Sequence, residues 1–251
     1  MSGILAGKRA LITGGGRGIG AAIARALAGA GAHVVVAGRT RASIEEVARE
    51  LCGTALELDL LDRKATDRVL ADVGRVDVLV NNAGAAESAS LERTTDELWD
   101  RILELDATAP FRVARAVVPG MVKAGWGRVI NIASNAGVTG YGYTAAYCAA
   151  KHAMVGMTRA LAIDLARTGV TINALCPGWV ETQMSGEAVA RIAAKTGRSR
   201  EEAHASLANM SPQRRMIEPA EVAHTALMLC AHEARGIHGQ ALVIDGGAVL
   251  K

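Results

Sequence analysis

The segment ALITGGGRGIG, residues 10–20, decides the fold of this chain. A short apolar run leads into a cluster of glycines, and a helical pattern begins directly after it. Glycines permit a tight turn and a close approach of backbone N–H groups to an anion, which the helix dipole also attracts. One interpretation is that this glycine-rich turn merely packs the helix against the sheet. Its position between the first strand and the first helix favours a pyrophosphate site.

Outward from this segment, short apolar runs alternate with longer helical patterns. Strands are predicted over residues 10–13, 33–36, 54–58, 76–80, 128–132, 170–174 and 241–244, and helices over 19–28, 43–51, 63–73, 96–123, 146–167 and 220–230. The strands are mostly apolar, which indicates that helices cover both faces of the sheet. The alternation predicts an α/β fold with a doubly wound, seven-stranded parallel sheet that binds ligands at its carboxyl edge.

The chain is expected to form a single dinucleotide-binding catalytic domain over residues 1–251, because no Pro-, Gly- or Ser-rich linker divides it. The alternation is interrupted at about residues 183–216. Two short helices are predicted there, the first over residues 187–195 and the second capped by Ser199 and Glu202. An insertion of this length at the carboxyl end of a strand is a candidate substrate lid.

Two local signals mark the longest predicted helix, residues 96–123. Thr94 and Glu97 have the spacing of a capping box at its start. Pro110 lies in its interior, where a proline has no N–H to donate, so a kink is expected there.

The composition excludes several classes of protein. Half of the residues are hydrophobic, which is incompatible with a disordered chain, and 28 Lys and Arg against 25 Asp and Glu give a net charge of only +3. This balance predicts neither a nucleic-acid partner nor a membrane surface. The four cysteines form no Cys-x-x-Cys pair, so we expect no metal site and no disulfide. With no signal peptide and no membrane-spanning run, a cytoplasmic protein is expected.

The end of the second predicted strand bears on the choice of cofactor. A carboxylate there would accept the 2′-hydroxyl of NAD(H), whereas a cation would bind the 2′-phosphate of NADP(H). This strand instead leads into Gly38, Arg39 and Arg41, and Arg17 can approach from the glycine loop. Arginine can clamp a phosphate with two hydrogen bonds. The arginines favour NADP(H) over NAD(H), and the alternative is that Arg39 and Arg41 are solvated loop charges.

All three tyrosines of the chain fall within residues 141–147. Tyr147 and Lys151 are four residues apart at a helix start and share one face, and Ser134 follows the fifth strand. A phenol exchanges protons at neutral pH only if its anion is stabilised, and a neighbouring ammonium does this. A hydroxyl such as that of Ser134 can hold a carbonyl oxygen where negative charge develops.

These motifs together resemble the short-chain dehydrogenase/reductase family along essentially the whole chain, and Asn81-Asn82-Ala83-Gly84 and Cys176-Pro177-Gly178 match in order and spacing. The resemblance implies a Rossmann-like fold and hydride transfer between a nicotinamide cofactor and an alcohol or carbonyl carbon. It implies that Tyr147 is the general acid/base, that Lys151 lowers the pKa of this tyrosine and binds ribose, and that Ser134 orients the substrate. The cofactor-binding residues it implies are Gly14, Arg17, Gly18, Ile19, Gly20, Arg39, Asp59, Leu60, Asn82, Ala83, Gly84, Tyr147, Lys151, Pro177, Gly178, Val180 and Thr182.

One position departs from the family pattern. The family usually has an asparagine in the long fourth helix, where it holds a water that relays protons to the lysine, and Asp106 takes that place here. An ionised carboxylate near Lys151 would raise the pKa of the lysine and offset part of its effect on Tyr147.

The predicted lid is similar in layout to lids of 3-hydroxybutyrate dehydrogenases and polyketide ketoreductases. This similarity suggests a small-molecule substrate of the 3-oxoacyl class, free or as a thioester of coenzyme A or a carrier protein. Basic lid residues could meet a phosphopantetheine, or they could form a solvated face; they are Arg191, Lys195, Arg198, Arg200, Arg214 and Arg215.

Two other functions stay open at this point. One is an NAD(P)-dependent dehydrogenase of a small, cyclic or aryl hydroxy compound. The other is a redox sensor that binds the dinucleotide without turnover, which the intact Ser134, Tyr147 and Lys151 argue against. The family resemblance also implies a homotetramer. One of its interfaces would pair the fourth and fifth predicted helices, and another would use residues 241–251.

Overall fold

The computed structural model describes residues 3–250, with the side chain of residue 250 left out, and it confirms the predicted α/β class. Its strands join into one seven-stranded sheet of order β3-β2-β1-β4-β5-β6-β7, and every neighbouring pair is parallel. The strands are β1 (Arg9–Thr13), β2 (His33–Gly38), β3 (Thr54–Glu57), β4 (Val78–Asn81), β5 (Gly127–Ile132), β6 (Val170–Pro177) and β7 (Ala241–Ile244). The order reverses at β1, where β1 lies between β2 and β4, so the loops after β1 and β4 meet at the carboxyl edge.

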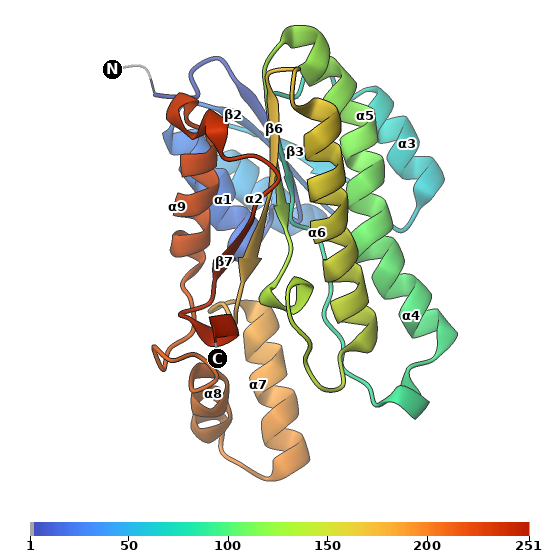
Figure 1. Ribbon diagram of the computed structural model, residues 1–251, viewed down its shortest axis with the longest axis vertical. Coiled ribbons are helices and arrows are strands. Elements are labelled where there is room, and N and C mark those ends of the chain that lie inside the picture. Colours follow the sequence, from blue (N-terminus) through green and yellow to red (C-terminus); the bar gives the residue numbers. More distant parts are fainter. Residues whose placement is uncertain (1–2, 251) are drawn as a thin grey trace.

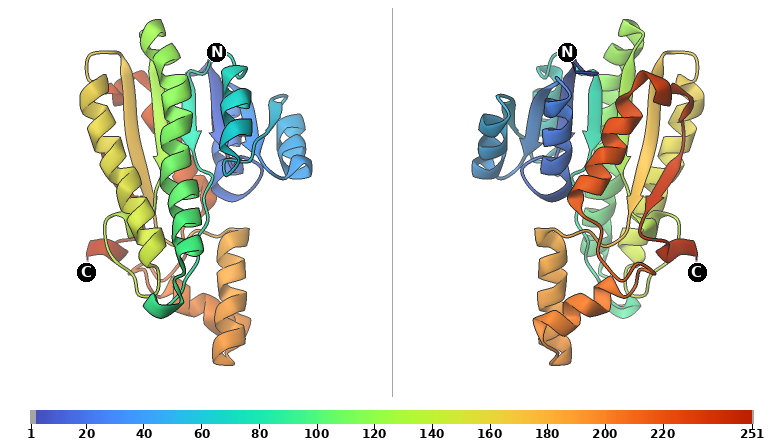
Figure 2. Two further views of the ribbon diagram at one scale, coloured as in Figure 1. Left: turned by 90° about the vertical axis from the view of Figure 1, so that its right-hand side faces the viewer. Right: turned by 90° about the vertical axis from the view of Figure 1, so that its left-hand side faces the viewer.

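Helices cover both faces of the sheet, as the apolar strands require (Figure 1). They are α1 (Gly18–Gly29), α2 (Arg41–Glu50), α3 (Arg63–Ala71), α4 (Asp96–Leu103), α5 (Ala109–Ala124), α6 (Ala145–Leu165), α7 (Gln183–Thr196), α8 (Arg200–Ala208) and α9 (Pro219–Cys230). One core lies between the sheet and α1, α2 and α9, and a second lies between the sheet and α3, α5 and α6 (Figure 2). No helix within residues 3–250 is long and apolar enough to cross a membrane.

Helices α7 and α8 form an arm beyond the carboxyl edge of the sheet, at the bottom of Figure 1. The arm has an apolar core of its own, made by Ala188, Val189, Ala203, Leu207 and Met216. A parallel bridge between Val180 and Ile217 closes its base. We call residues 181–216 the lid. Ser199 and Glu202 cap α8 reciprocally, as the sequence predicted.

The long helix expected over residues 96–123 is interrupted. α4 ends at Leu103, residues Glu104–Thr108 form one π-helical turn, and α5 then continues to Ala124. Pro110 cannot donate to the carbonyl four residues earlier, which is that of Asp106, so the regular ladder cannot pass this point. The capping prediction is wrong by one residue. Thr95 is the cap and accepts from Leu98 N at 3.3 Å, because Thr94 ends the preceding 3₁₀ turn.

Candidate active site

The glycine loop after β1 forms a cradle that side chains would fill. Gly14 and Gly18 have φ of +64° and +53°, in the left-handed region that favours glycine. A Cβ on Gly14 would lie 2.9 Å from the Cα of Ala83, and a Cβ on Gly20 would collide with the carbonyl oxygen of Gly14. α1 starts here with no side-chain cap, so N–H groups of its first turn remain available to an anion. The cradle therefore fits a pyrophosphate.

Side chains lock this loop to the loop after β4. Asn82 donates from Nδ2 to the carbonyl oxygens of Thr13 and Gly14, both at 3.0 Å. The Thr13 hydroxyl accepts from the N–H groups of Asn82 and Ala83, at 3.0 and 3.2 Å. The expected cofactor residues of these two loops, Ile19 and Gly84 included, thus lie together at the switch point of the sheet.

The end of β2 lacks an acidic side chain in the structure as in the sequence. Arg39 is exposed and makes no ion pair with residues 3–250, whereas Arg41 pairs with Glu45 at 2.7 Å and is already engaged. Arg17 donates from Nη1 to Oε1 of Gln183 at 2.9 Å, which joins the glycine loop to the first turn of the lid. Of the expected arginines, Arg39 is thus unpaired within residues 3–250 and Arg17 bonds to the lid.

The remaining expected cofactor residues follow β3 and β6. The Asp59 carboxylate accepts from the N–H of Leu61 at 3.1 Å and is exposed, while Leu60 is buried. After β6, Gly178 donates to the carbonyl oxygen of Ile244 at 3.0 Å, directly beyond Pro177 at the strand end. Thr182 caps α7, and a Cβ on Gly18 would lie 3.2 Å from its methyl group. Val180 pairs with Ile217 at the base of the lid, and the proximity of Thr182 to Gly18 places the start of the lid beside the glycine cradle.

Ser134, Tyr147 and Lys151 meet beside this cradle. Ser134 follows β5, is buried, and accepts from the N–H of Ala136 at 3.1 Å. Tyr147 and Lys151 lie on the first two turns of α6, and the lysine Nζ is 5.6 Å from the centre of the tyrosine ring. The ammonium donates to the carbonyl oxygen of Ile132 at 3.1 Å and lies 3.3 Å from Oδ2 of the fully buried Asp106.

Burial and charge act against each other on these groups. Burial raises the pKa of Tyr147 and the charge of Asp106 raises it further, while the Lys151 ammonium and the Ser134 hydroxyl oppose this rise. Burial lowers the pKa of Lys151, but the charges of Asp106 and Tyr147 outweigh burial and raise it. At neutral pH the phenol is therefore protonated and the amine is charged, which suits a tyrosine that donates a proton.

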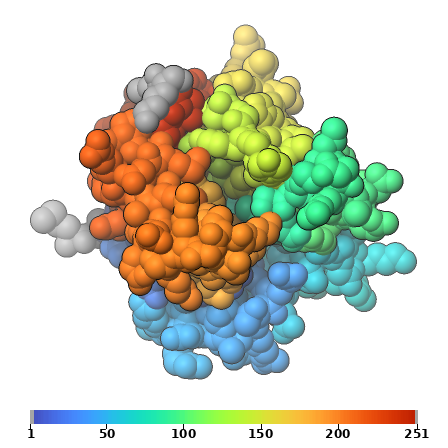
Figure 3. Space-filling view, turned by 90° about the horizontal axis from the view of Figure 1, so that it is seen from below, coloured from blue at the N-terminus to red at the C-terminus, as the bar shows by residue number. Residues whose placement is uncertain are grey.

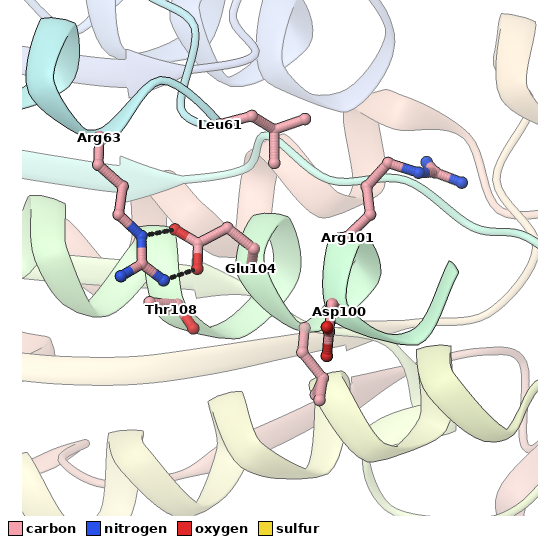
Figure 4. Close-up of a pocket in the computed structure, with 7 residues that line it drawn as sticks. Leu61, Arg63, Asp100, Arg101, Glu104 and Thr108 are labelled. Carbon is pink, nitrogen blue, oxygen red and sulfur yellow. Dashed lines mark hydrogen bonds and ion pairs between the residues drawn. The ribbon is translucent and has the colours of Figure 1, made fainter. Parts of the chain in front are cut away.

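This centre lies at the carboxyl edge of the sheet, apart from a second hollow in the surface. Figure 3 views the carboxyl edge, which the orange lid, the yellow-green loop before α6 and the green segment leading to α4 surround. A separate groove on the outer side of the π turn has a volume of about 510 Å³ and is lined by Leu61, Arg63, Asp100, Arg101, Leu103, Glu104 and Thr108. Figure 4 draws the residues that line it. Arg63 reaches Glu104 across it, with its Nε 2.9 Å from Oε1. The groove holds none of the expected catalytic residues.

Three contacts of the site have no signal in the sequence. The Ile132 carbonyl holds Lys151, Gln183 holds Arg17, and the N–H of Ala85 donates to Oδ1 of Asp106 at 2.9 Å. Two of these use backbone atoms, which any residue type supplies. The remaining contact, between Arg17 and Gln183, depends on how the lid lies over the glycine loop.

Comparisons with known proteins agree with this geometry. The sequence profile of the family described as short chain dehydrogenase matches residues 8–193. The chain is 37% identical to D-beta-hydroxybutyrate dehydrogenase of Cupriavidus necator over 98% of its length and 99% of that protein. It is 38% identical to a putative ketoacyl reductase of Streptomyces coelicolor, over 95% of each chain. A crystal structure of an actinorhodin polyketide ketoreductase variant with NADPH superposes with a TM-score of 0.93, at 37% identity and 99% coverage of both chains. The chain belongs to the short-chain dehydrogenase/reductase family of oxidoreductases.

Proposed function

We propose that this enzyme uses NADPH to reduce a 3-oxoacyl compound to the corresponding 3-hydroxy compound. The observation that carries the reaction class is the meeting of Ser134, Tyr147 and Lys151 beside the glycine cradle. The substrate class is supported by two relatives, one named a ketoacyl reductase and the other a beta-hydroxybutyrate dehydrogenase.

The chain's own residues supply the proton and hold the reacting oxygen. Bound NADPH supplies the hydride that the carbonyl carbon receives. The phenol of Tyr147 donates its proton to the carbonyl oxygen, so the product is the neutral alcohol and the tyrosine becomes a phenolate. The Ser134 hydroxyl donates a hydrogen bond to the same oxygen as its charge develops. The Lys151 ammonium stabilises the phenolate until a proton from water restores the phenol.

Cofactor preference follows from the end of β2. Arg39 and Arg17 supply charge for the 2′-phosphate, and Gly38 leaves room where an acidic side chain would repel it. The NADPH in the structure of the actinorhodin ketoreductase variant supports this choice.

The lid suggests how an acyl thioester is held. Five of its basic side chains are exposed and make no ion pair within residues 3–250: Arg191, Lys195, Arg198, Arg200 and Arg214. Arg215 is instead engaged with Glu221 and drops out of the expected set. The free cations favour the phosphate groups of coenzyme A or a carrier-bound phosphopantetheine over a free acid.

A second function is favoured by the hydroxybutyrate dehydrogenase among the relatives. The same site, run in the opposite direction, would oxidise a small hydroxy compound with NAD(P)⁺. A panel of 3-oxoacyl thioesters, free 3-oxo acids, simple ketones and the matching alcohols separates the two, with NADPH and NADH absorbance followed in parallel. Faster turnover of thioesters supports the proposal. Faster turnover of small alcohols supports the alternative, and tight NADPH binding without turnover of any compound contradicts both.

We further propose a homotetramer. The helices that would pair carry exposed apolar side chains, with Phe111 and Val122 on α5 and Ile163 on α6, the last 80% exposed. Val243 on β7 is 43% exposed and would belong to the second interface, whose final residue, 251, lies outside the described residues. Sedimentation should give a tetramer at micromolar concentration, and a monomer would contradict this proposal.

A further inference from the structure

Asp106 makes two contacts that reach opposite sides of the site. Its Oδ1 accepts from the N–H of Ala85, in the loop after β4, at 2.9 Å. Its Oδ2 forms an ion pair with the Nζ of Lys151 on α6 at 3.3 Å and has no hydrogen-bond partner within residues 3–250. Both charged side chains are shielded from water, with Asp106 0% and Lys151 3% exposed. A single carboxylate therefore ties the cofactor loop to the lysine of the site.

The usual amide of the family cannot satisfy both contacts here. The N–H of Ala85 and the ammonium of Lys151 are both donors, and an amide has only one acceptor atom. If the oxygen of an asparagine accepted from Ala85, its NH₂ group would face the ammonium. In the flipped orientation, the NH₂ group would face the Ala85 N–H. The local geometry thus matches an aspartate.

The π turn directs two acidic residues to opposite sides. Glu104 points outward into the groove and pairs with Arg63 (Figure 4), while Asp106 points inward to Lys151. The turn exists where Pro110 interrupts the α-helical ladder. π turns of this kind are frequent at functional sites.

The carboxylate of Asp106 opposes the effect of the Lys151 ammonium on Tyr147. Burial raises the pKa of Asp106, but Lys151 and the Ala85 N–H oppose this rise, and a neutral Asp106 would leave the buried ammonium without a counter-charge. The other titratable groups that act on Tyr147 and Lys151 within residues 3–250 are the thiols of Cys148 on α6 and Cys176 on β6. Burial raises the pKa of Cys176 to about 11, so that thiol carries no charge at neutral pH.

We propose that Asp106 is a positioning residue that holds the Lys151 ammonium, keeps Tyr147 protonated, and so favours carbonyl reduction over alcohol oxidation at neutral pH. This inference rests on the proposed role of Tyr147 as the proton donor. The family's asparagine would leave the full charge of the lysine acting on the tyrosine. The aspartate opposes that effect with a negative charge of its own.

The test is an ultraviolet absorbance titration of tyrosinate in the cofactor-free protein, with Tyr147→Phe subtracted. Only three tyrosines contribute to the signal, and the readout needs neither substrate nor turnover. Asp106→Asn should move the midpoint of Tyr147 to lower pH, because a negative charge that opposes phenolate formation is lost. Asp100→Asn is the matched control, since it removes the same charge from the exposed side of α4 and should not move the midpoint.

Rates in both directions complete the test. In Asp106→Asn, the loss of reduction at high pH and the onset of oxidation should both move to lower pH, and the ratio of kcat for oxidation to kcat for reduction at neutral pH should rise. A midpoint for Tyr147 that matches wild type overturns the inference, even if the enzyme is an active reductase. Should Asp106→Asn not fold, Asp106→Ala removes the same charge without adding donors, and the same shift is required of it. A downward shift in an enzyme that is inactive on every carbonyl tested leaves this inference standing and contradicts the proposed function.

Discussion

Replacing Arg39 by alanine isolates the contact on which the proposed cofactor preference depends. The side chain of Arg39 is exposed and unpaired within residues 3–250, so its removal breaks no ion pair or side-chain hydrogen bond there. A charge-assisted hydrogen bond contributes about 1.5–3 kcal/mol, which corresponds to roughly a ten- to hundredfold change in affinity. Arg39→Ala should therefore weaken NADPH binding by about that factor and leave NADH binding nearly unchanged.

Arg41→Ala is the control for this experiment, because Arg41 is two residues away and already pairs with Glu45. Gly38→Asp goes further, since its carboxylate would repel the 2′-phosphate and accept from the ribose hydroxyl of NADH. A Cβ at Gly38 would lie 3.1 Å from the Cγ2 of Ile44, so that side chain must yield slightly. The assay is kcat/KM and Kd for both cofactors. A wild type that prefers NADH, or an Arg39→Ala variant equally poor with both, refutes the reasoning.

Two further predictions concern the lid and its base. Leu207→Ala removes a buried side chain from the small lid core, which should cost about 2–5 kcal/mol of lid stability. The KM for the substrate should rise and the affinity for NADPH should stay intact. An equal loss of substrate and NADPH binding would contradict a lid that acts on the substrate alone. The hydrogen bond from Arg215 lowers the pKa of Glu221 from 4.5 to about 2. The pair therefore stabilises the folded state fully at pH values above 4.5, and this stabilisation is lost as the pH falls through about 2. Glu221→Gln should therefore melt below wild type at neutral pH, with the gap closing toward pH 2; a gap independent of pH would show that the charge is not responsible.

The sheet could be predicted because each strand has a local sequence pattern. β1 and β2 are apolar runs bounded by glycine and charged residues, and the structure places them within two residues of the expected ends. β6 was expected to end at Ala174 but continues to Pro177, because Leu175 and its neighbours pair with β7. That extension depends on a partner strand distant in sequence, which no local pattern reveals.

The site could be predicted less completely, for a physical reason. Ser134 and the cofactor loops stand at the carboxyl ends of strands, Tyr147 and Lys151 stand on α6, and only the topology brings them together. The sequence also identified Asp106 as the unusual neighbour of Lys151. It could not show that the neighbour makes a direct ion pair, since this depends on a π turn whose form is set by hydrogen bonding around Pro110. The contact between Arg17 and Gln183 likewise depends on how the lid lies.

The central claim is that Tyr147 supplies the proton to a substrate oxygen while the rest of the site binds NADPH. Tyr147→Phe keeps the ring and removes only the transferable proton, so NADPH affinity should stay near that of wild type. Turnover should fall by at least about a hundredfold, the lower end of what general acid catalysis contributes. Lys151→Met should damage both turnover and binding, because its ammonium is proposed to meet the ribose as well. A Tyr147→Phe enzyme that retains more than about a tenth of the wild-type rate would contradict the account.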